Sequence, residues 1–391
     1  MRFGWARLGF AVFLAAQVAC SAILGTRDLT YDANADGGGS SGGPGDGSSG
    51  GPVDGSSGGP TDGGEGGACT DLMSDGKNCG TCGHDCLGGT CMMGKCQPVA
   101  LKMGGNPRTI RLDATHLYWS DANGSRVSQM DKNGANVIDL VVGAAGGKND
   151  FPFGLAVDGT TVYWGSADGF VLRCKIGGCA NTPQVVATTT SFFDVAQANG
   201  KLFWIESTGP DKIFSAPVAQ NGGPGALVAS NTEWNRVAAD ATNLYVTSDD
   251  KTVHRVDPGT KVATIVSTGN LKAFAVAVDD TNVYWSDGDD PASIDFAPKT
   301  ATNAAPTPIA ATQHNPLAIA VDAAHLYWAN AFVGLGGGTG SINMCAFTAC
   351  APVTLADNRR SPLSIAVDDQ AIYWAEFDDG NGMGGIYKLA K

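Results

Sequence analysis

Short apolar runs alternate with turn residues along the C-terminal three quarters of the chain, and the alternation repeats. Each repeat opens with an apolar run such as Leu155–Val157, which suits a strand buried on both faces. A turn rich in Asp, Gly, Asn and Thr follows, and a β-branched and aromatic run such as Val162–Trp164 resumes an extended strand. Each repeat therefore predicts a β-hairpin.

Seven copies of this hairpin occur at a regular spacing. The aromatic residues that mark them lie 39 to 46 residues apart: Tyr118, Tyr163, Phe203, Tyr245, Tyr284, Tyr327 and Tyr373. Apolar residues at helical spacing are absent from these units. A period of about 40–45 residues with short strands is typical of propeller blades rather than helical repeats.

Two more short strands follow each hairpin, so each unit predicts a four-stranded antiparallel meander. One full cycle consists of Gly154–Val157, Val162–Gly165, Gly169–Cys174 and Gln184–Ala187. The last unit ends after its third strand, while Val99–Lys102 matches the fourth strand of other units. We therefore expect an all-β fold, a seven-bladed β-propeller over residues 97–391, in which Val99–Lys102 completes the last blade.

Residues 1–19 have the pattern of a secretory signal peptide. Arg2 and Arg7 precede the apolar run Leu8–Ala19, which is too short to span a bilayer. The sequence Val18-Ala19-Cys20-Ser21 resembles the lipobox of bacterial lipoproteins, although Gln17 stands where that motif usually has Leu. The resemblance implies lipidation of Cys20; the alternative is ordinary cleavage nearby.

Residues 20–68 predict a disordered linker. Sixteen of the 31 residues from 37 to 67 are Gly, interspersed with Ser, Asp and Pro. Such a segment has too little apolar surface to offset the entropy of ordering. We expect it to tether the lipid-anchored head.

Residues 69–96 form a cysteine-rich module with six cysteines: Cys69, Cys79, Cys82, Cys86, Cys91 and Cys96. The string NCGTCGHDC resembles the stigma-specific (STIG-type) module. Three disulfides in an exported chain are favoured over zinc held by Cys79, Cys82 and His84, and the sequence leaves the pairing open. Two further pairs, Cys174–Cys179 and Cys345–Cys350, would close small loops.

Two repeats carry a recognisable signature. Tyr118–Asp121 and Tyr284–Asp287 are similar to the Tyr-Trp-Thr-Asp motif of YWTD propellers, found in lipoprotein-receptor ectodomains. That resemblance implies a protein-binding module without catalysis. The chain departs from the family in its blade count, since those propellers usually have six blades.

Two sets of repeated residues admit a structural or a functional interpretation. The six turn aspartates suit caps of their own turns better than a metal ring: Asp113, Asp158, Asp240, Asp279, Asp322 and Asp368. The tryptophans suit packing between blades better than a sugar-stacking surface: Trp119, Trp164, Trp204, Trp285, Trp328 and Trp374.

The net charge and the motif content argue against several classes of function. The net charge of −13 argues against nucleic-acid binding, and no nucleophile, zinc-protease or P-loop motif occurs. The candidate ligand residues lie on one face, at connections between blades and between second and third strands: Asp150, Phe151, Glu206, Glu233, Trp234, Asp287, His314, Asn315, Arg359, Arg360 and Glu376.

These features favour a lipid-anchored cell-envelope protein, in the outer membrane and facing the periplasm or the exterior. Its propeller would bind a protein, peptide or glycan without catalysis and without a cofactor. One alternative is a propeller hydrolase or lactonase that uses Ca²⁺ held by Glu206, Asp287 and Glu376. The other is a purely structural envelope protein.

Overall fold

The computed structural model describes residues 69–121, 124–143, 147–231, 233–270, 272–288, 291–331, 340–377 and 384–391. The predicted signal peptide (1–19) and linker (20–68), with Cys20, lie outside the described residues. All regular elements in the described ranges are strands. This part of the chain contains no helix of the length and apolar character that crossing a bilayer requires.

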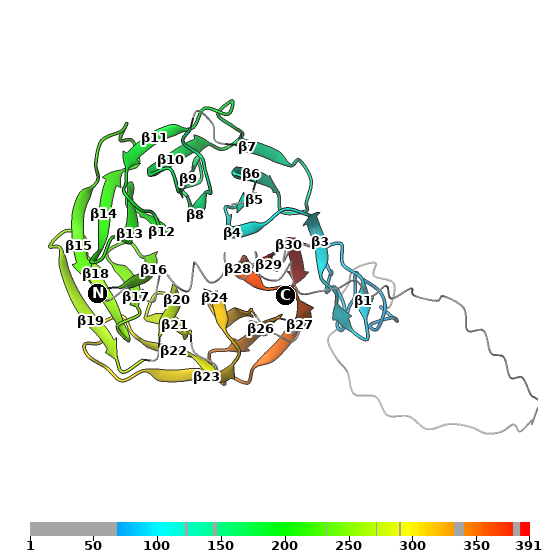
Figure 1. The fold of residues 1–391 in the computed structure, drawn as a ribbon. Coiled ribbons are helices and arrows are strands. Elements are labelled where there is room, and N and C mark those ends of the chain that lie inside the picture. Colours follow the sequence, from blue (N-terminus) through cyan, green and yellow to red (C-terminus); the bar gives the residue numbers. More distant parts are fainter. Residues whose placement is uncertain are drawn as a thin grey trace, which may run out of the picture. The chain divides into compact units, whose positions relative to one another are not determined.

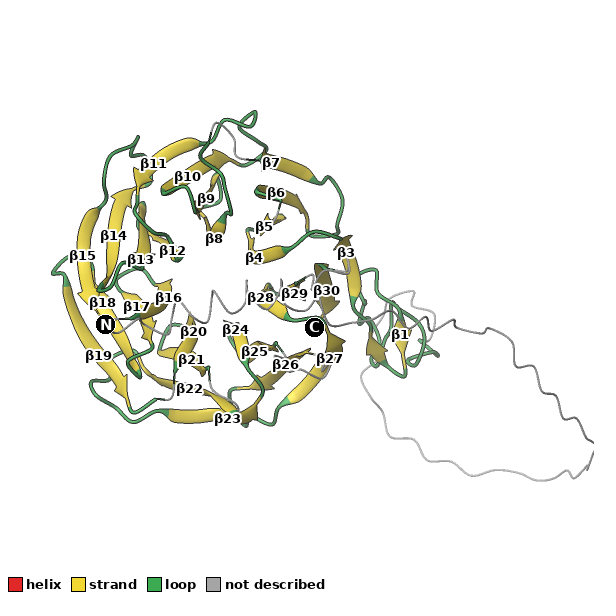
Figure 2. Ribbon diagram, in the orientation of Figure 1, coloured by secondary structure: helices red, strands yellow, loops and turns green. Residues whose placement is uncertain are grey.

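The described strands build seven four-stranded antiparallel sheets, arranged as blades around an axis (Figures 1 and 2). Blade 1 contains β4 (Pro107–Leu112), β5 (His116–Asp121), β6 (Arg126–Asp131) and β7 (Ile138–Val142). Blade 2 contains β8 (Phe153–Val157), β9 (Thr161–Ser166), β10 (Phe170–Lys175) and β11 (Gln184–Thr188). Blade 3 contains β12 (Asp194–Ala198), β13 (Lys201–Glu206), β14 (Asp211–Pro217) and β15 (Ala226–Asn231).

The next three blades repeat this order. Blade 4 contains β16 (Trp234–Ala239), β17 (Leu244–Ser248), β18 (Thr252–Asp257) and β19 (Val262–Thr268). Blade 5 contains β20 (Ala273–Val278), β21 (Asn282–Asp287), β22 (Ala292–Pro298) and β23 (Thr307–Gln313). Blade 6 contains β24 (Pro316–Val321), β25 (His325–Asn330), β26 (Gly340–Ala346) and β27 (Val353–Arg359). The first strand of each blade is innermost and the fourth is outermost (Figure 1).

Blade 7 combines the two ends of the propeller sequence. It contains β28 (Pro362–Val367), β29 (Ala371–Glu376), β30 (Gly385–Ala390) and β3 (Val99–Met103). The strand β3 runs antiparallel to β30, with Val99 opposite Lys388 and Met103 opposite Gly385. The innermost strands contact their neighbours all the way round, and β28 contacts β4. The predicted all-β fold with seven blades is confirmed.

One apolar cluster fills each interface between neighbouring blades in the described structure. Six of these clusters pair the tyrosine of one hairpin with the tryptophan of the next blade, as Tyr118 pairs with Trp164 and Tyr373 with Trp119. Successive residues of a strand point to opposite faces, so adjacent Tyr and Trp serve opposite neighbours. The prediction that the tryptophans pack between blades is confirmed. At the blade 3–blade 4 interface, Phe203 and Val246 occupy the two positions.

The turn aspartates cap their own hairpins, as the sequence predicts. In blade 5, Asp279 Oδ1 accepts the N–H groups of Thr281 and Asn282 at 2.7 and 2.6 Å, and Oδ2 accepts the Tyr284 hydroxyl at 2.7 Å. The same two backbone bonds and the same tyrosine bond recur in the other five hairpins that have the Asp. One carboxylate thus holds both the turn and the strand that follows it.

Blade 3 lacks both partners of this contact. Ala198 replaces the Asp, and Phe203, which has no hydroxyl, replaces the Tyr. Its first hairpin closes instead through Asn199 and Gly200, whose φ values of 49° and 70° give a two-residue turn. The Asp and the Tyr are therefore present together or absent together.

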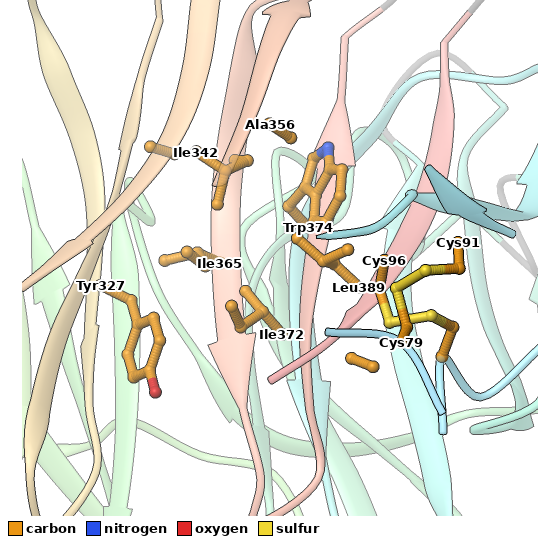
Figure 3. Close-up of a cluster of buried hydrophobic side chains, with 13 residues drawn as sticks. Cys79, Cys91, Cys96, Tyr327, Ile342, Ala356, Ile365, Ile372, Trp374 and Leu389 are labelled. Carbon is orange, nitrogen blue, oxygen red and sulfur yellow. A yellow bond between two sulfur atoms is a disulfide. The ribbon is translucent and has the colours of Figure 1, made fainter. Parts of the chain in front are cut away.

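The cysteine-rich module contains the short strands β1 (Cys91–Met92) and β2 (Lys95–Cys96), which pair with each other. The disulfides Cys79–Cys91 and Cys86–Cys96 each tie one of these strands to the segment that precedes them. Cys69 and Cys82 are also disulfide-bonded. The sulfur atoms of Cys79, Cys86 and Cys96 lie within 4.8 Å of one another, but the disulfides leave them no thiolate for zinc. These cysteines pack in one cluster with Trp374 and Leu389 of blade 7 (Figure 3).

The propeller contains two further disulfides, Cys174–Cys179 and Cys345–Cys350. Each links the end of a third strand to the loop that precedes the fourth strand of its blade. Multiple disulfides are typical of exported proteins, because they persist only in an oxidising compartment.

Candidate functional site

The antiparallel order of each blade gives the propeller two distinct faces. The hairpin turns that join first to second strands and third to fourth strands lie on one, which we call the turn face. The loops from second to third strands and the connections between blades lie on the other, the loop face. All the candidate ligand residues predicted from the sequence lie on the loop face or at strand ends that reach it: Asp150, Phe151, Glu206, Glu233, Trp234, Asp287, His314, Asn315, Arg359, Arg360 and Glu376.

Glu206 and Glu376 are buried and hydrogen-bonded within the scaffold. Glu206 accepts the indole N–H of Trp204 at 3.2 Å and the hydroxyls of Thr189 and Thr190 at 2.6 and 2.7 Å. Glu376 accepts the indole N–H of Trp374 at 2.7 Å. Each carboxylate therefore fastens a second strand to the connection that enters its blade.

Glu376 also interacts with two arginines of that connection. Its carboxylate accepts the backbone N–H of Arg360 at 3.2 Å and lies 3.5 Å from Nη1 of Arg359. Arg359 stacks over the ring of Tyr387, 5.2 Å from its centroid. Burial raises the pKa of Glu376, while the Trp374 and arginine contacts oppose the rise.

Asp287 belongs to a buried carboxyl pair in blade 5. The hydroxyl of Ser293 lies 3.0 Å from Oδ2 of Asp287 and 3.0 Å from Oδ2 of Asp295, and both acids are 3% exposed. Burial and the charge of Asp287 raise the pKa of Asp295 to about 6. The pair thus holds a shared proton more readily than isolated acids do.

Four other predicted residues have local structural contacts. Trp234 is 2% exposed, and its backbone N–H donates to Asp211 at 2.8 Å. Asn315 donates to the carbonyl of Ala331 at 2.9 Å. Asp150 accepts the hydroxyl of Ser125 at 3.2 Å.

The fourth residue, Phe151, has a φ of 42° and stacks on Phe153, with ring centroids 6.5 Å apart. Glu233, His314 and Arg360 are instead exposed. The loop face therefore mixes buried anchoring residues with a smaller exposed set.

The structure does not bring the three acids of the calcium alternative together. Glu206, Asp287 and Glu376 end the second strands of blades 3, 5 and 7, and each is bonded within its own part of the ring. A calcium site needs several oxygens converging on one ion. The geometry gives these carboxylates separate structural roles.

Sequence reasoning missed two arginines on the innermost strands. Arg236 of β16 lies with its guanidinium carbon 4.8 Å from the ring centroid of Phe193 and 4.6 Å from that of Phe274. Phe193 leads into blade 3 and Phe274 belongs to blade 5, whereas Arg236 belongs to blade 4 between them. Phe193 directly precedes the innermost strand β12 and Phe274 lies in the innermost strand β20, so the Arg236 guanidinium lies near the propeller axis.

The second arginine, Arg111, comes from β4 in blade 1. Burial lowers the pKa of both guanidinium groups, the charge of Asp194 opposes this in both, and Arg111 lowers the pKa of Arg236 further. Arg111, Asp194 and Arg236 belong to β4, β12 and β16, the innermost strands of blades 1, 3 and 4, which surround a common axis (Figure 1).

The turn face carries a groove of about 1060 Å³ between blades 4 and 5, which the sequence did not indicate. Its walls include Asp240, Tyr245, Asp257 and Lys299. Lys299 forms a 2.9 Å ion pair with Asp240 across the two blades and lies over the ring of Tyr245. Lys299 thus joins the two blades through Asp240 and Tyr245, and the groove lies where the two blades meet.

No family model matches the chain. No curated protein matches it either. The YWTD and STIG resemblances therefore remain predictions.

Solved structures resemble the propeller. Streptogramin B lyase has a TM-score of 0.58 at 11% identity, covering 75% of this chain and 98% of that one. U3-55K has a TM-score of 0.58 at 9% identity, with the same coverage. The designed protein Ika8 has a TM-score of 0.50 at 12% identity, covering 74% of this chain and 98% of that one. At these identities the likeness shows the fold alone.

Proposed function

We propose that this protein is a lipid-anchored envelope protein whose propeller binds a protein, peptide or glycan through its loop face without catalysis. The observation that carries the proposal is that the loop face contains both buried anchoring residues and exposed side chains. Glu206 and Glu376 are buried in hydrogen bonds to tryptophans, whereas Glu233, His314 and Arg360 are exposed. Exposed charged and aromatic side chains on a rigid scaffold are suited to recognition.

Binding arrays of peptides and glycans test the loop face. The variant Glu233→Ala/His314→Ala/Arg360→Ala removes exposed side chains there and is expected to lose at least about tenfold in affinity for any ligand found. The matched control, Asp280→Ala/Gln370→Ala/Lys201→Ala, removes the same charges from exposed positions of the turn face. Equal loss in both variants, or a full-length protein that binds nothing, would contradict the proposal and favour a purely structural role.

The anchor requires a separate experiment, because Cys20 lies outside the described residues. We expect an alkyne-tagged fatty acid to label the protein in a bacterial host, and Cys20→Ser to abolish the label. Fractionation should place the labelled protein in the outer membrane. If the protein is unlabelled and freely released, the lipid anchor is disproved. Export without an anchor, which the disulfides support, would then be the remaining explanation.

A further inference from the structure

The innermost strands place two arginines and one acid around the axis of the propeller: Arg111 of β4, Arg236 of β16 and Asp194 of β12. The charge of Asp194 acts on both arginines, so positive charge is in excess within this group. Asp194 is already engaged, because its Oδ2 accepts the backbone N–H of Val237 at 3.1 Å. This excess contrasts with the net charge of −13 of the whole chain.

In the described part of the chain, neither guanidinium is hydrogen-bonded to a carboxylate. Within the described residues, Arg111 donates one hydrogen bond, from Nη1 to the carbonyl of Ile110 at 2.9 Å. Arg236 likewise donates one, from Nη1 to the carbonyl of Asn235 at 3.2 Å. A guanidinium has five N–H donors, so most of them remain available. Both side chains are partly exposed, so solvent or a ligand reaches them.

The surroundings hold at least one of these groups in place. Phe193 and Phe274 contact the Arg236 guanidinium from two blades, which restricts its rotation while leaving its in-plane donors open. Arg236 is therefore preorganised, and the charge of one carboxylate, Asp194, acts on both Arg111 and Arg236, so their positive charge is only partly balanced.

We propose that Arg111 and Arg236 bind an oxyanion, a carboxylate or phosphate group, at the axis of the propeller. Planar guanidinium groups bind such groups through paired, charge-assisted hydrogen bonds. The rings of Phe193 and Phe274 would adjoin an apolar part of the same ligand. The inference deepens the proposed function, and rests on it, by naming the chemical group that the ligand presents.

Calorimetric titration of the purified full-length protein with sodium citrate and with sodium phosphate tests the site, against sodium chloride at equal ionic strength. We expect saturable binding of at least one anion, weakened about tenfold or more in Arg111→Gln and in Arg236→Gln. Preference for citrate indicates a carboxylate ligand and preference for phosphate indicates a phosphorylated one. The exposed turn-face variant Lys201→Gln should bind as the unaltered protein does.

Two results would overturn the inference: no saturable binding of either anion, or equal binding by the unaltered protein and both axial variants. If Arg236→Gln fails to fold, Arg236→Lys replaces it, because lysine keeps the charge but loses the planar donor pair and should still weaken binding. The assay uses only simple anions. A negative result would therefore disprove the anion site without disproving macromolecular binding at the loop face. A negative result with the peptide and glycan arrays would likewise disprove loop-face binding without disproving the anion site.

Discussion

The two faces of the propeller differ in how their side chains are hydrogen-bonded to the scaffold. On the turn face, six hairpins use one device, an Asp that caps the turn and accepts a tyrosine hydroxyl. On the loop face, the buried tryptophans find different acceptors: Trp164 bonds Asn149, Trp328 bonds Gln313, and Trp374 bonds Glu376. The uniform face specifies the scaffold, and the varied face is the one on which binding can diverge.

The largest expected effect comes from opening the ring on which both faces depend. Deleting residues 97–102 removes most of β3, leaving β30 as an unpaired edge. We expect the melting temperature to fall by about 10 °C or more, since a domain of this size loses about 2–4 °C per kcal/mol. Calorimetry checks this, and an equally long deletion at 40–45 serves as the control. An unchanged melting temperature would show that closure by β3 adds little.

The turn device is tested by a neighbouring pair of acids. Asp279→Ala removes two backbone caps and the Tyr284 contact and should cost about 2–3 kcal/mol. Asp280→Ala, at the adjacent exposed position, should cost less than about 0.5 kcal/mol. Chemical denaturation measures both. Similar losses in the two variants would disprove the capping role.

A double-mutant cycle with Tyr284→Phe extends that test. If the Asp and Tyr act as a unit, the double variant should be about 1 kcal/mol more stable than additivity predicts. Blade 3, with Ala198 and Phe203, is the natural counterpart of that variant. If the two losses of stability are strictly additive, the absence of both the Asp and the Tyr from blade 3 has another cause.

The carboxyl pair near the loop face predicts a pH dependence. The pKa of Asp295 is raised to about 6 in the folded protein, so the folded state binds more protons than the unfolded state between about pH 4 and 6. The contribution of this group to stability is therefore fully present below about pH 4 and lost as the pH rises through 6.

The variant Asp295→Asn removes this penalty. It should be more stable than the unaltered protein by about 1–3 kcal/mol at pH 8, and the gain should disappear near pH 4. Paired urea titrations across that range measure the difference and cancel the contributions of the turn aspartates. A gain that does not change with pH would assign the effect to packing.

The smallest expected effect concerns calcium. Because Glu206, Asp287 and Glu376 are bonded in separate blades, calcium chloride or a chelator should shift the melting temperature by less than about 1 °C. A larger shift that Glu206→Ala or Asp287→Ala removes would favour the calcium-dependent hydrolase instead.

Sequence periodicity was sufficient for the scaffold and insufficient for the site. Seven blades, the Asp caps and the placement of the tryptophans follow from residues that repeat at fixed offsets. The acceptor for each tryptophan differs between blades, so no offset reveals it. Arg111 and Arg236 come together only because a closed ring brings blades 1 and 4 to a common axis. Their encounter depends on tertiary geometry that a one-dimensional pattern does not contain.

The pairing of β3 with β30 also determines when the molecule can become complete. Val99 leaves the ribosome early, yet its partner Lys388 lies three residues from the end of the chain as given. The first strand of the propeller in sequence, β3, thus pairs with its last, β30, and contacts of such long sequence separation form slowly. Until β30 has been synthesised, β3 remains an unpaired edge. The flanking disulfides Cys79–Cys91 and Cys86–Cys96 span short loops and can form without waiting.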